Sequence, residues 1–112
     1  MQPKPKPPLP SDWHNRVVLT GLARVHDALR YTPAGIAVLE FALEHVSRQS
    51  AGGFERDVRC LVQALLVGPL ATELAASLNE RTVTAQGFLA ARSLRNPKLV
   101  LHIQHVEFEK GI

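Results

Sequence analysis

The first half of the chain alternates between apolar and polar residues with a period of two, which is the pattern of a β-strand with one covered face. In the segment 15–25, one face carries Val17, Leu19, Gly21, Ala23 and Val25. The sequence RYTPAG follows, and its Pro33 and Gly35 are typical of a turn. A second strand then has Ala37, Leu39, Phe41 and Leu43 as expected inward residues, and Glu40, Ala42 and Glu44 as expected outward residues. The polar sequence SRQSAGG is expected to end this strand.

The second half of the chain predicts three more strands and one short helix. An aliphatic segment, 54–66, is expected to form the third strand. The period then changes, because Leu70, Leu74 and Leu78 recur every fourth residue behind Pro69, which suits the first turn of a helix. Two further strands, 82–91 and 98–108, are joined by RSLRNP as a hairpin loop. Their expected inward residues are Val83, Ala85, Gly87, Leu89, Ala91, Leu99, Leu101 and Ile103.

This order of elements is that of a known small barrel. Three strands, a helix and two more strands within about 95 residues are the element order of the OB-fold. The sequence therefore predicts an all-β, five-stranded OB-fold barrel with a short helix between the third and fourth strands. At 112 residues there is room for one domain, expected over 14–112, after a disordered arm rich in Pro and Lys over 1–13. Trp13 is either an anchor into the domain or a free stacking ring.

Cysteine usage and hydropathy indicate the compartment. A single cysteine excludes an intramolecular disulfide and fits a reducing compartment such as the cytoplasm. Cys60 lies in the apolar third strand and is expected to be buried and inert. The N-terminus lacks the apolar region of a secretory signal, and Gln63 and Glu73 interrupt the most apolar stretch, so no membrane-spanning segment is expected. We therefore expect a cytoplasmic protein that does not contact a membrane.

Two groups of residues invite a chemical interpretation, but their spacing argues against one. The α-carbons of Glu40 and Glu44 should lie about 13 Å apart on a strand, whereas paired glycosidase carboxyls work at about 5 to 9.5 Å. Glu44 and His45 are successive residues and should point to opposite faces. His102 and His105 should also face opposite ways on an alternating strand, so they predict no metal site. We expect neither enzymatic activity nor a metal or other cofactor.

The positive charge of the chain is unevenly distributed. The formal net charge is +3, and no acid occurs between Glu80 and Glu107. OB-folds bind single-stranded nucleic acid with cations along the backbone and aromatic faces under the bases, and they supply both from strands and loops. The alternative is that these are ordinary solubilising charges. The predicted nucleic-acid-binding residues, which lie in and beside two loops, are Arg48, Phe54, Arg56, Arg59, Arg92, Arg95 and Lys98.

Several segments resemble the family of primosomal replication protein N, or PriB, whose members are dimeric OB-fold relatives of bacterial single-stranded-DNA-binding protein. They are NRVVLTGLARV, RYTPAGIAVLEFALEH, TAQGFLA and LVLHIQHVEF. The resemblance covers about residues 14–109 and rests on Asn15, Gly21, Gly35, Phe41, Leu43, Glu44, His45 and Gln86-Gly87-Phe88 at matching spacing. It implies a non-enzymatic protein that binds single-stranded DNA, stimulates the primosomal helicase and passes the complex to later helicase-loading factors.

The resemblance also assigns roles to individual positions. The DNA-contacting aromatic residue after the family's second strand matches Phe54, and the arginine two residues later matches Arg56. A tryptophan that some relatives carry on the third strand corresponds to Arg59, so a cation stands in place of a stacking ring. The loop between the fourth and fifth strands is shorter than in the best-known members, and it has two arginines and one lysine within 92–98. These departures concern affinity rather than fold.

The outer face of the first strand carries Val18 and Leu22, which are predicted to form a homodimer interface because a second copy is one physical way to cover them.

Two alternative functions stay open. A general single-stranded-DNA-binding protein usually ends in a flexible linker with an acidic tip, whereas this sequence ends in VEFEKGI directly after its last strand. The other alternative is an OB-fold interaction module that binds mainly a helicase or loader and contacts DNA weakly.

Overall fold

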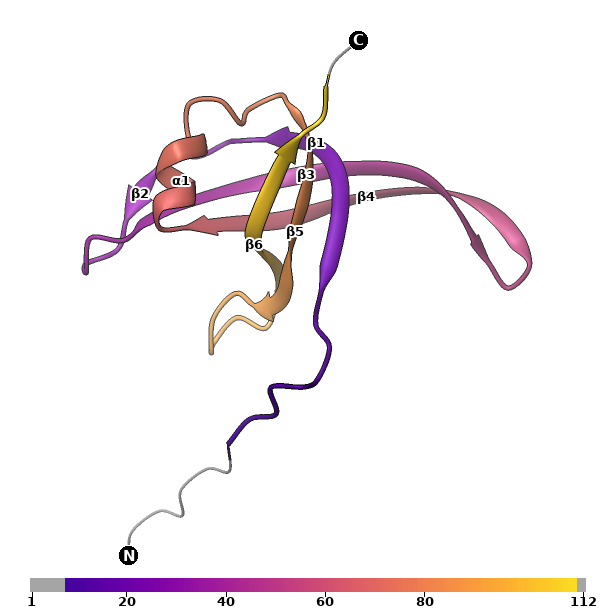
Figure 1. Cartoon of the computed structure of the whole chain (residues 1–112), viewed down its shortest axis with the longest axis horizontal. Helices are drawn as coiled ribbons and strands as arrows, with labels where there is room; N and C mark the ends of the chain where they lie inside the picture. Colours follow the sequence, from indigo (N-terminus) through magenta and orange to yellow (C-terminus); the bar gives the residue numbers. More distant parts are fainter. Residues whose placement is uncertain (1–7, 111–112) are drawn as a thin grey trace, which may run out of the picture.

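The computed structural model describes residues 8–110, so residues 1–7 of the predicted arm lie outside the described part (Figure 1). The elements in this range are β1 (Val17–Arg24), β2 (Arg30–Tyr31), β3 (Ala37–Ala51), β4 (Phe54–Val67), α1 (Pro69–Leu74), β5 (Thr82–Ala91) and β6 (Leu99–Phe108). The two-residue β2 was expected to be part of a turn. It pairs with the start of β3 just before the turn that contains Gly35, whose φ is 82°.

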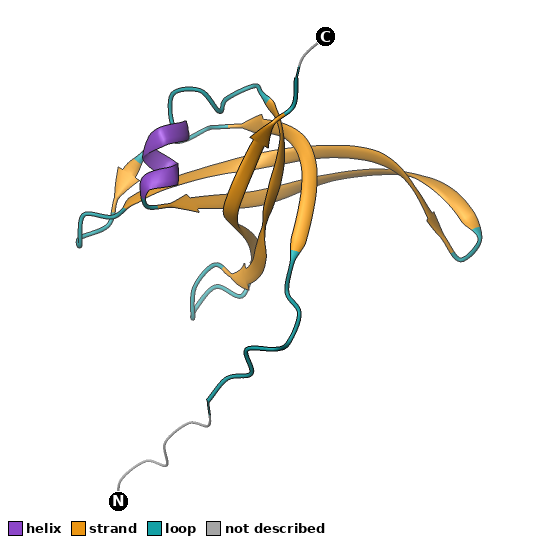
Figure 2. Cartoon of the chain, in the orientation of Figure 1, coloured by secondary structure: helices purple, strands orange, loops and turns teal. Residues whose placement is uncertain are grey.

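Five of these strands close into a barrel (Figure 2). β1 pairs with β5 on one side and with β3 on the other, β3 pairs with β4, and β5 pairs with β6, all in antiparallel fashion. A parallel pairing of β4 with β6 closes the ring. The short helix α1 connects β4 to β5. This is the OB-fold topology, so the predicted fold class is confirmed.

The core lies inside the ring and is formed mostly by residues that the alternation predicted. Ala37, Leu39, Phe41 and Leu43 of β3 are buried, as are Val83 and Ala85 of β5. Leu78, after α1, is also buried, whereas Leu70 and Leu74 are half-buried against the core. Gly21 lies where β1 crosses β3, and a Cβ there would come within 2.8 Å of the Glu44 carbonyl oxygen. A side chain at this position would therefore separate the two strands.

The β3–β4 hairpin is longer than expected and projects beyond the barrel (Figure 1). The segment 47–51, which was expected to be a loop, continues β3 in register with β4 as far as the pair Ala51 and Phe54. The turn contains only Gly52 and Gly53, with φ values of 61° and 82°. Two successive residues with positive φ suit a tight hairpin turn whose twist matches that of the strands. Polarity in this segment reflects a strand with two exposed faces, not the end of a strand.

Several expected orientations were wrong. Ala42 was expected to face outward, but it is buried, because its cross-strand neighbours are the long side chains of Arg24 and Gln63. Leu89 and Leu99 were expected to face inward, but they are exposed because they lie near the loop end of the β5–β6 hairpin. Ala91, expected to face inward, is exposed there as well. Val100 is buried at this end instead.

A bulge in β6 changes the side-chain alternation after Ile103. Gln86 of β5 pairs with His105, but the next residue, Gly87, pairs with Ile103, so Gln104 has no partner on β5. The expectation that His102 and His105 face opposite ways was therefore wrong: they oppose Phe88 and Gln86, two residues apart on β5 and on one face. Gly87 is required here, because a Cβ would come within 1.9 Å of the His102 carbonyl oxygen.

Cys60 was expected to be buried, but it is exposed. It opposes His45 on the part of the β3–β4 hairpin that extends past the barrel, where no other strand of residues 8–110 pairs with β4. The apolar sequence around Cys60 suggested burial, but a side chain on a strand is buried only where another element packs over it. Within the described residues, no helix is long and apolar enough to cross a membrane.

Candidate nucleic-acid interface

The far end of the β3–β4 hairpin carries four of the seven predicted nucleic-acid-binding residues. Residues directly opposite each other on antiparallel strands share a face. The register pairs Val46 with Arg59 and Arg48 with Asp57, so Arg48 and Arg59 share one face of the hairpin. Phe54 and Arg56, two residues apart on β4, share the other face, and the Phe54 side chain is 74% exposed. The four residues therefore form two pairs on opposite faces.

The charges at this end are only partly free. Arg48 Nη2 lies 2.9 Å from Glu55 Oε2, and Arg48 Nη1 lies 3.6 Å from Asp57 Oδ1. Arg56 and Arg59 have no acidic partner among the residues that the structure describes. The cations available for a ligand without breaking an ion pair are therefore Arg56 and Arg59.

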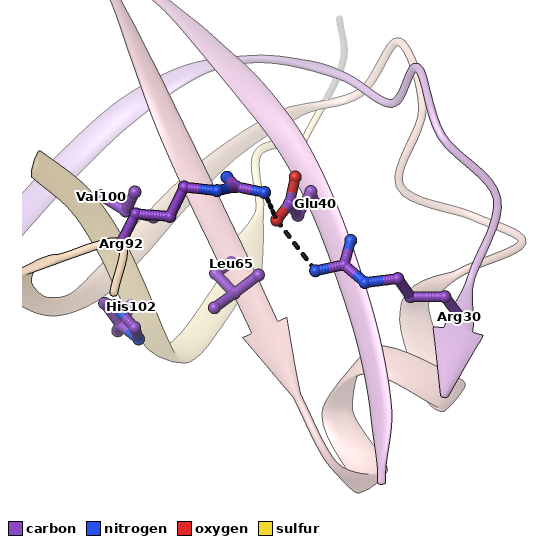
Figure 3. A pocket seen from close by; sticks show the side chains of 6 residues that line it. All are labelled: Arg30, Glu40, Leu65, Arg92, Val100 and His102. Atoms are coloured by element: carbon purple, nitrogen blue, oxygen red, sulfur yellow. Dashed lines mark hydrogen bonds and ion pairs between the residues drawn. The ribbon is translucent and has the colours of Figure 1, made fainter. Parts of the chain in front are cut away.

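The β5–β6 loop brings together the other three predicted residues. The Arg92 amide donates to the Lys98 carbonyl at 2.8 Å, and the Asn96 amide donates to Ser93 Oγ at 3.1 Å, so the loop is a short, hydrogen-bonded turn. Arg95 and Lys98 are exposed and have no acidic partner in the described range. Arg92 differs from them because its side chain turns back to the barrel and pairs with Glu40 (Figure 3).

Glu40 joins two arginines that are far apart in the sequence. Arg30 Nη2 lies 3.0 Å from Glu40 Oε1, and Arg92 Nη2 donates to the same oxygen. Burial by itself would raise the pKa of Glu40, but the hydrogen bonds and charges of Arg30 and Arg92 outweigh it, and the pKa lies below its ordinary value. The carboxyl group is therefore ionised at neutral pH. These three side chains line a cavity of about 100 Å³ together with Leu65, Val100 and His102 (Figure 3).

Sequence reasoning did not find this cluster. Arg30 was assigned to a turn, and Glu40 was interpreted as an outward carboxylate. A partial signal existed, because the turn containing Pro33 and Gly35 has to bring the residues before it back alongside the start of β3. The register confirms this, with Arg30 opposite Val38. Nothing in the sequence indicated that Arg92 reaches the same carboxylate.

Glu44 and His45 make separate contacts, as their alternation predicted. Glu44 Oε1 lies 3.3 Å from Arg24 Nε on the outer face of the barrel. The His45 ring bridges two groups, with Nδ1 at 2.6 Å from the Thr20 carbonyl oxygen and Nε2 at 2.7 Å from Ser47 Oγ. The ring of His102 stacks on Phe88 at 5.1 Å between centroids. No group of three potential metal ligands gathers anywhere in residues 8–110.

The two predicted dimer-interface residues lie on the outer face of β1. Val18 is exposed and Leu22 is half-buried. β1 pairs with β5 from Val17 to Leu22, but with β3 only from Leu22 to Arg24. Along the first part of β1, the edge that faces away from β5 therefore has no strand partner within the described chain. The Trp13 ring, just before β1, is 80% exposed, so it is not an anchor into the barrel.

The two clusters of cations are held apart by the barrel. In Figure 1 the tip of the β3–β4 hairpin projects to one side, whereas the β5–β6 loop lies below the barrel. The cavity around Glu40 lies between the base of the hairpin and this loop, since its lining residues come from β2, β3, β4, β6 and the residue after β5. Only an extended ligand can contact both clusters at once.

Comparison with known proteins identifies the family. A family model described as "Another single-strand binding protein family" matches residues 15–105. The chain is 34% identical over 97 residues to the replication restart protein PriB of Yersinia enterocolitica, with 84% of this chain and 92% of that protein covered. It is 31% identical over 104 residues to PriB of Nitrosomonas europaea, with 93% and 95% covered. The chain belongs to the PriB family. The resemblance seen in the sequence is thus confirmed.

Solved structures support the same assignment. The PriB protein of Ralstonia solanacearum matches with a TM-score of 0.77 at 28% identity, over 88% of this chain and 100% of that chain. The single-stranded DNA binding protein of Thermus aquaticus matches with a TM-score of 0.71 at 22% identity, over 88% of this chain and 51% of that one. The second likeness shows the fold alone. The OB-fold is therefore common to this chain, to a PriB-family protein and to a more distant protein.

Proposed function

We propose that this chain is a non-enzymatic single-stranded-DNA-binding protein of replication restart. The proposal is supported by its membership of the PriB family and by one feature of the hairpin. The exposed Phe54 ring and the Arg56 guanidinium, which has no acidic partner among the described residues, share one face near the tip of a hairpin whose strands pair along their whole length. A ring for a base and a cation for the adjacent phosphate are the two elements that single-strand binding requires.

The β5–β6 loop supplies a second contact in this proposal. Arg95 and Lys98 meet phosphates farther along the same strand, while Arg59 contacts the strand on the other face of the hairpin. Arg48 and Arg92 contribute only through donors that their carboxylate partners leave free, or after those ion pairs break. DNA that passes from the hairpin tip to the loop crosses the barrel, so binding should favour flexible single strands over stiff duplexes.

Partners and assembly follow from the same role. We propose that the protein forms a homodimer through β1, where a second copy covers Val18 and Leu22 and the unpaired strand edge. We propose further that it stimulates the primosomal helicase and passes the complex to helicase-loading factors. A protein with this role acts on the bacterial chromosome, in the cytoplasm.

Fluorescence anisotropy of labelled single-stranded and duplex oligonucleotides, measured against salt, tests the DNA-binding proposal. Phe54→Ala should weaken single-strand binding about tenfold, because stacking of a base on a ring contributes about 1 to 3 kcal/mol. Phe54→Leu keeps an apolar side chain without the ring and should lose nearly as much. Arg95→Ala with Lys98→Ala should reduce the steepness of the log–log salt dependence by roughly 1.4, at about 0.7 for each lost phosphate contact.

A charge-matched control exists on the same two strands. Arg81 precedes β5 and Lys110 follows β6, so both lie at the end of the β5–β6 hairpin opposite the loop. Arg81→Ala with Lys110→Ala removes the same charge and should leave the salt dependence unchanged. Absence of binding to either oligonucleotide at low salt would refute the proposed function. Equal losses in the loop variant and the control would leave DNA binding in place and exclude the loop as the contact.

The dimer and the helicase role need separate measurements. Val18→Glu should convert a dimer into a monomer in light scattering, since a charge on the covered face opposes burial. An unaltered dimer would mean that the interface lies elsewhere.

Unwinding of a forked DNA by the helicase should accelerate in the presence of the wild-type protein. If the wild-type protein does not change the unwinding rate, the helicase proposal is wrong.

A second function is favoured by a specific observation. Two of the six predicted cations, Arg48 and Arg92, are engaged by carboxylates, which lowers the positive charge that DNA can meet. An interaction module that binds mainly a helicase or loader would have this weak DNA surface. This alternative would be supported if the wild-type protein retains the purified helicase in a pull-down but binds DNA no more tightly than the Arg95→Ala/Lys98→Ala variant does.

A further inference from the structure

Arg30 and Arg92 converge on a single oxygen atom. The two residues come from β2 and from the residue after β5, and both guanidinium groups donate to Glu40 Oε1 (Figure 3). Two like charges held this close repel each other unless an anion lies between them. Glu40 supplies that anion. It does so from the outer face of β3, where it is the least exposed of the three side chains, at 18% against 53% for Arg30 and 42% for Arg92.

The two arginines have most of their hydrogen-bonding capacity left. Each guanidinium carries five N–H donors, and each uses one of them on Glu40. No other acceptor among the described residues contacts either group. The adjoining cavity has a volume of about 100 Å³, so it has room for water. Leu65, Val100 and His102 also line it, and the buried His102 Nε2 atom has no hydrogen-bond partner in the described structure.

The arrangement has the chemistry of a phosphate site. Guanidinium groups bind carboxylates and phosphates through the same planar fork of donors, so a carboxylate between two arginines occupies the position that a phosphate oxygen would take. The cavity also lies beside the β5–β6 loop, since Arg92, the residue after β5, lines it, so a strand that contacts Arg95 and Lys98 passes close to it. Glu40 stays ionised at neutral pH, so it keeps the negative charge with which it pairs with both arginines in the free protein.

We propose that Arg30 and Arg92 form a binding site for one backbone phosphate of single-stranded DNA, and that the Glu40 carboxylate occupies this site when no DNA is bound. Binding at this site exchanges a carboxylate for a phosphodiester. Glu40 therefore lowers the affinity of the protein for single strands. It also reduces the contribution of Arg30 and Arg92 to the salt dependence of DNA binding. The inference rests on the proposed function.

Glu40→Gln is the direct test, because it removes the charge and keeps the shape of the side chain. Anisotropy with a labelled oligothymidine should show about tenfold tighter binding at low salt than for the wild type. The log–log salt dependence should steepen by roughly 0.7, the equivalent of one more phosphate contact. Glu44→Gln is the matched control. It removes the same charge four residues away on the same strand, from a carboxylate that pairs with Arg24 outside the cavity. It should change the affinity less than about twofold, which is within the modest contribution of an exposed charge pair.

A double-mutant cycle keeps the test independent of folding. Arg92→Ala should have a small effect on DNA binding in the wild type, where Glu40 holds the residue, and should abolish most of the gain in the Glu40→Gln background. Equal effects of Arg92→Ala in both backgrounds would overturn the inference. Thermal melts of all four proteins identify any variant that does not fold, and the cycle is then completed with Arg92→Lys.

The possible outcomes separate this inference from the proposed function. If the wild type binds DNA and Glu40→Gln binds no more tightly, the inference fails and the proposed function stands. If Glu44→Gln gains as much as Glu40→Gln, the gain is a general charge effect and the inference fails. If neither protein binds DNA, the proposed function fails and the inference with it. Side-chain NMR of Glu40→Gln distinguishes free inorganic phosphate from the DNA backbone as the ligand of this site. Arginine signals that shift with inorganic phosphate but not with the oligonucleotide would overturn the assignment to the DNA backbone.

Discussion

The two halves of the β3–β4 hairpin share one hydrogen-bonded ladder but have opposite environments. In the barrel half, from Ala37 to Leu43 on β3, the inward side chains are buried under β1, β5, β6 and α1. In the distal half, from Val46 to Ala51, most side chains on both faces are exposed, although the register with β4 continues without interruption. Backbone pairing thus determines where a strand runs, and neighbouring elements determine which of its faces is buried.

The difference also separates stability from function in one pair of strands. The barrel half contributes the apolar burial that stabilises the fold. The distal half contributes little burial and holds Phe54, Arg56 and Arg59 away from the core, where a ligand can reach them. The residues that we propose for binding can therefore vary without unfolding the barrel. Substitutions that are chemically alike but fall in different halves provide the clearest tests.

The largest expected difference is between the two phenylalanines of the hairpin. Phe41 is 2% exposed in the core, whereas Phe54 is exposed at the tip. Phe41→Ala should lower the free energy of unfolding by about 3 to 5 kcal/mol, because it leaves a cavity. Phe54→Ala should change it by less than about 0.5 kcal/mol. Urea denaturation followed by circular dichroism measures both, and similar losses would mean that the tip is packed in solution.

A glycine pair gives the next largest difference. A Cβ on Gly87 would collide with the His102 carbonyl oxygen, so Gly87→Ala has to separate β5 from β6 and should cost about 3 kcal/mol. Gly53 at the distal turn has φ 82° and open space around it, so Gly53→Ala should cost about 1 kcal/mol through backbone strain alone. The same denaturation experiment ranks the two, and the reverse order would refute the bulge geometry.

Ion pairs in the two halves should differ more modestly. Glu40 is largely covered and holds two arginines, whereas Glu55 pairs with Arg48 where both are 67% exposed. Glu40→Gln should lower the free energy of unfolding by about 1 to 2 kcal/mol at neutral pH. Glu55→Gln should change it by less than about 0.5 kcal/mol.

The Glu40 contribution should also depend on pH. Burial raises the pKa of Glu40, but Arg30 and Arg92 lower it more, so the folded-state pKa is below the unfolded-state value. The stabilisation is therefore fully present above the unfolded-state pKa and is lost as the pH falls through the folded-state pKa. His102 also lines the cavity, but it is the same residue in the wild type and in Glu40→Gln, so the comparison of these two proteins isolates the effect of Glu40. Melting temperatures of the wild type and Glu40→Gln should converge in acid, and a constant difference would contradict the ion-pair explanation.

The smallest difference is between two arginines of the distal half. Arg56 shares a face with Phe54, and Arg59 lies on the other face with Val46. If bases stack on Phe54, Arg56→Ala should weaken single-strand binding about fivefold, and Arg59→Ala should weaken it about twofold. Both losses are of the size expected for a single charge-assisted hydrogen bond. Equal losses measured by anisotropy would mean that the strand wraps around the tip and contacts both faces.

The successful predictions and the failures have different physical origins. Alternation identified Leu39, Phe41, Leu43, Val83 and Ala85 as core residues, because a period of two can bury only one face. It failed after Ile103, where an unpaired Gln104 shifts the phase of β6. It also failed for Cys60, because an apolar sequence shows that a strand can be covered but not whether an element lies above it.

The sequence by itself determined the order of the strands, the position of the helix, most of the core and the family, since all of these follow from local periodicity and residue spacing. The tertiary structure decided which charges are free. Arg92 and Arg95 are alike in the sequence, yet closure of the barrel brings only Arg92 to Glu40, and β2 brings Arg30 to the same oxygen. Contacts between residues far apart in the chain depend on how strands close into a ring, and no local pattern encodes that distance.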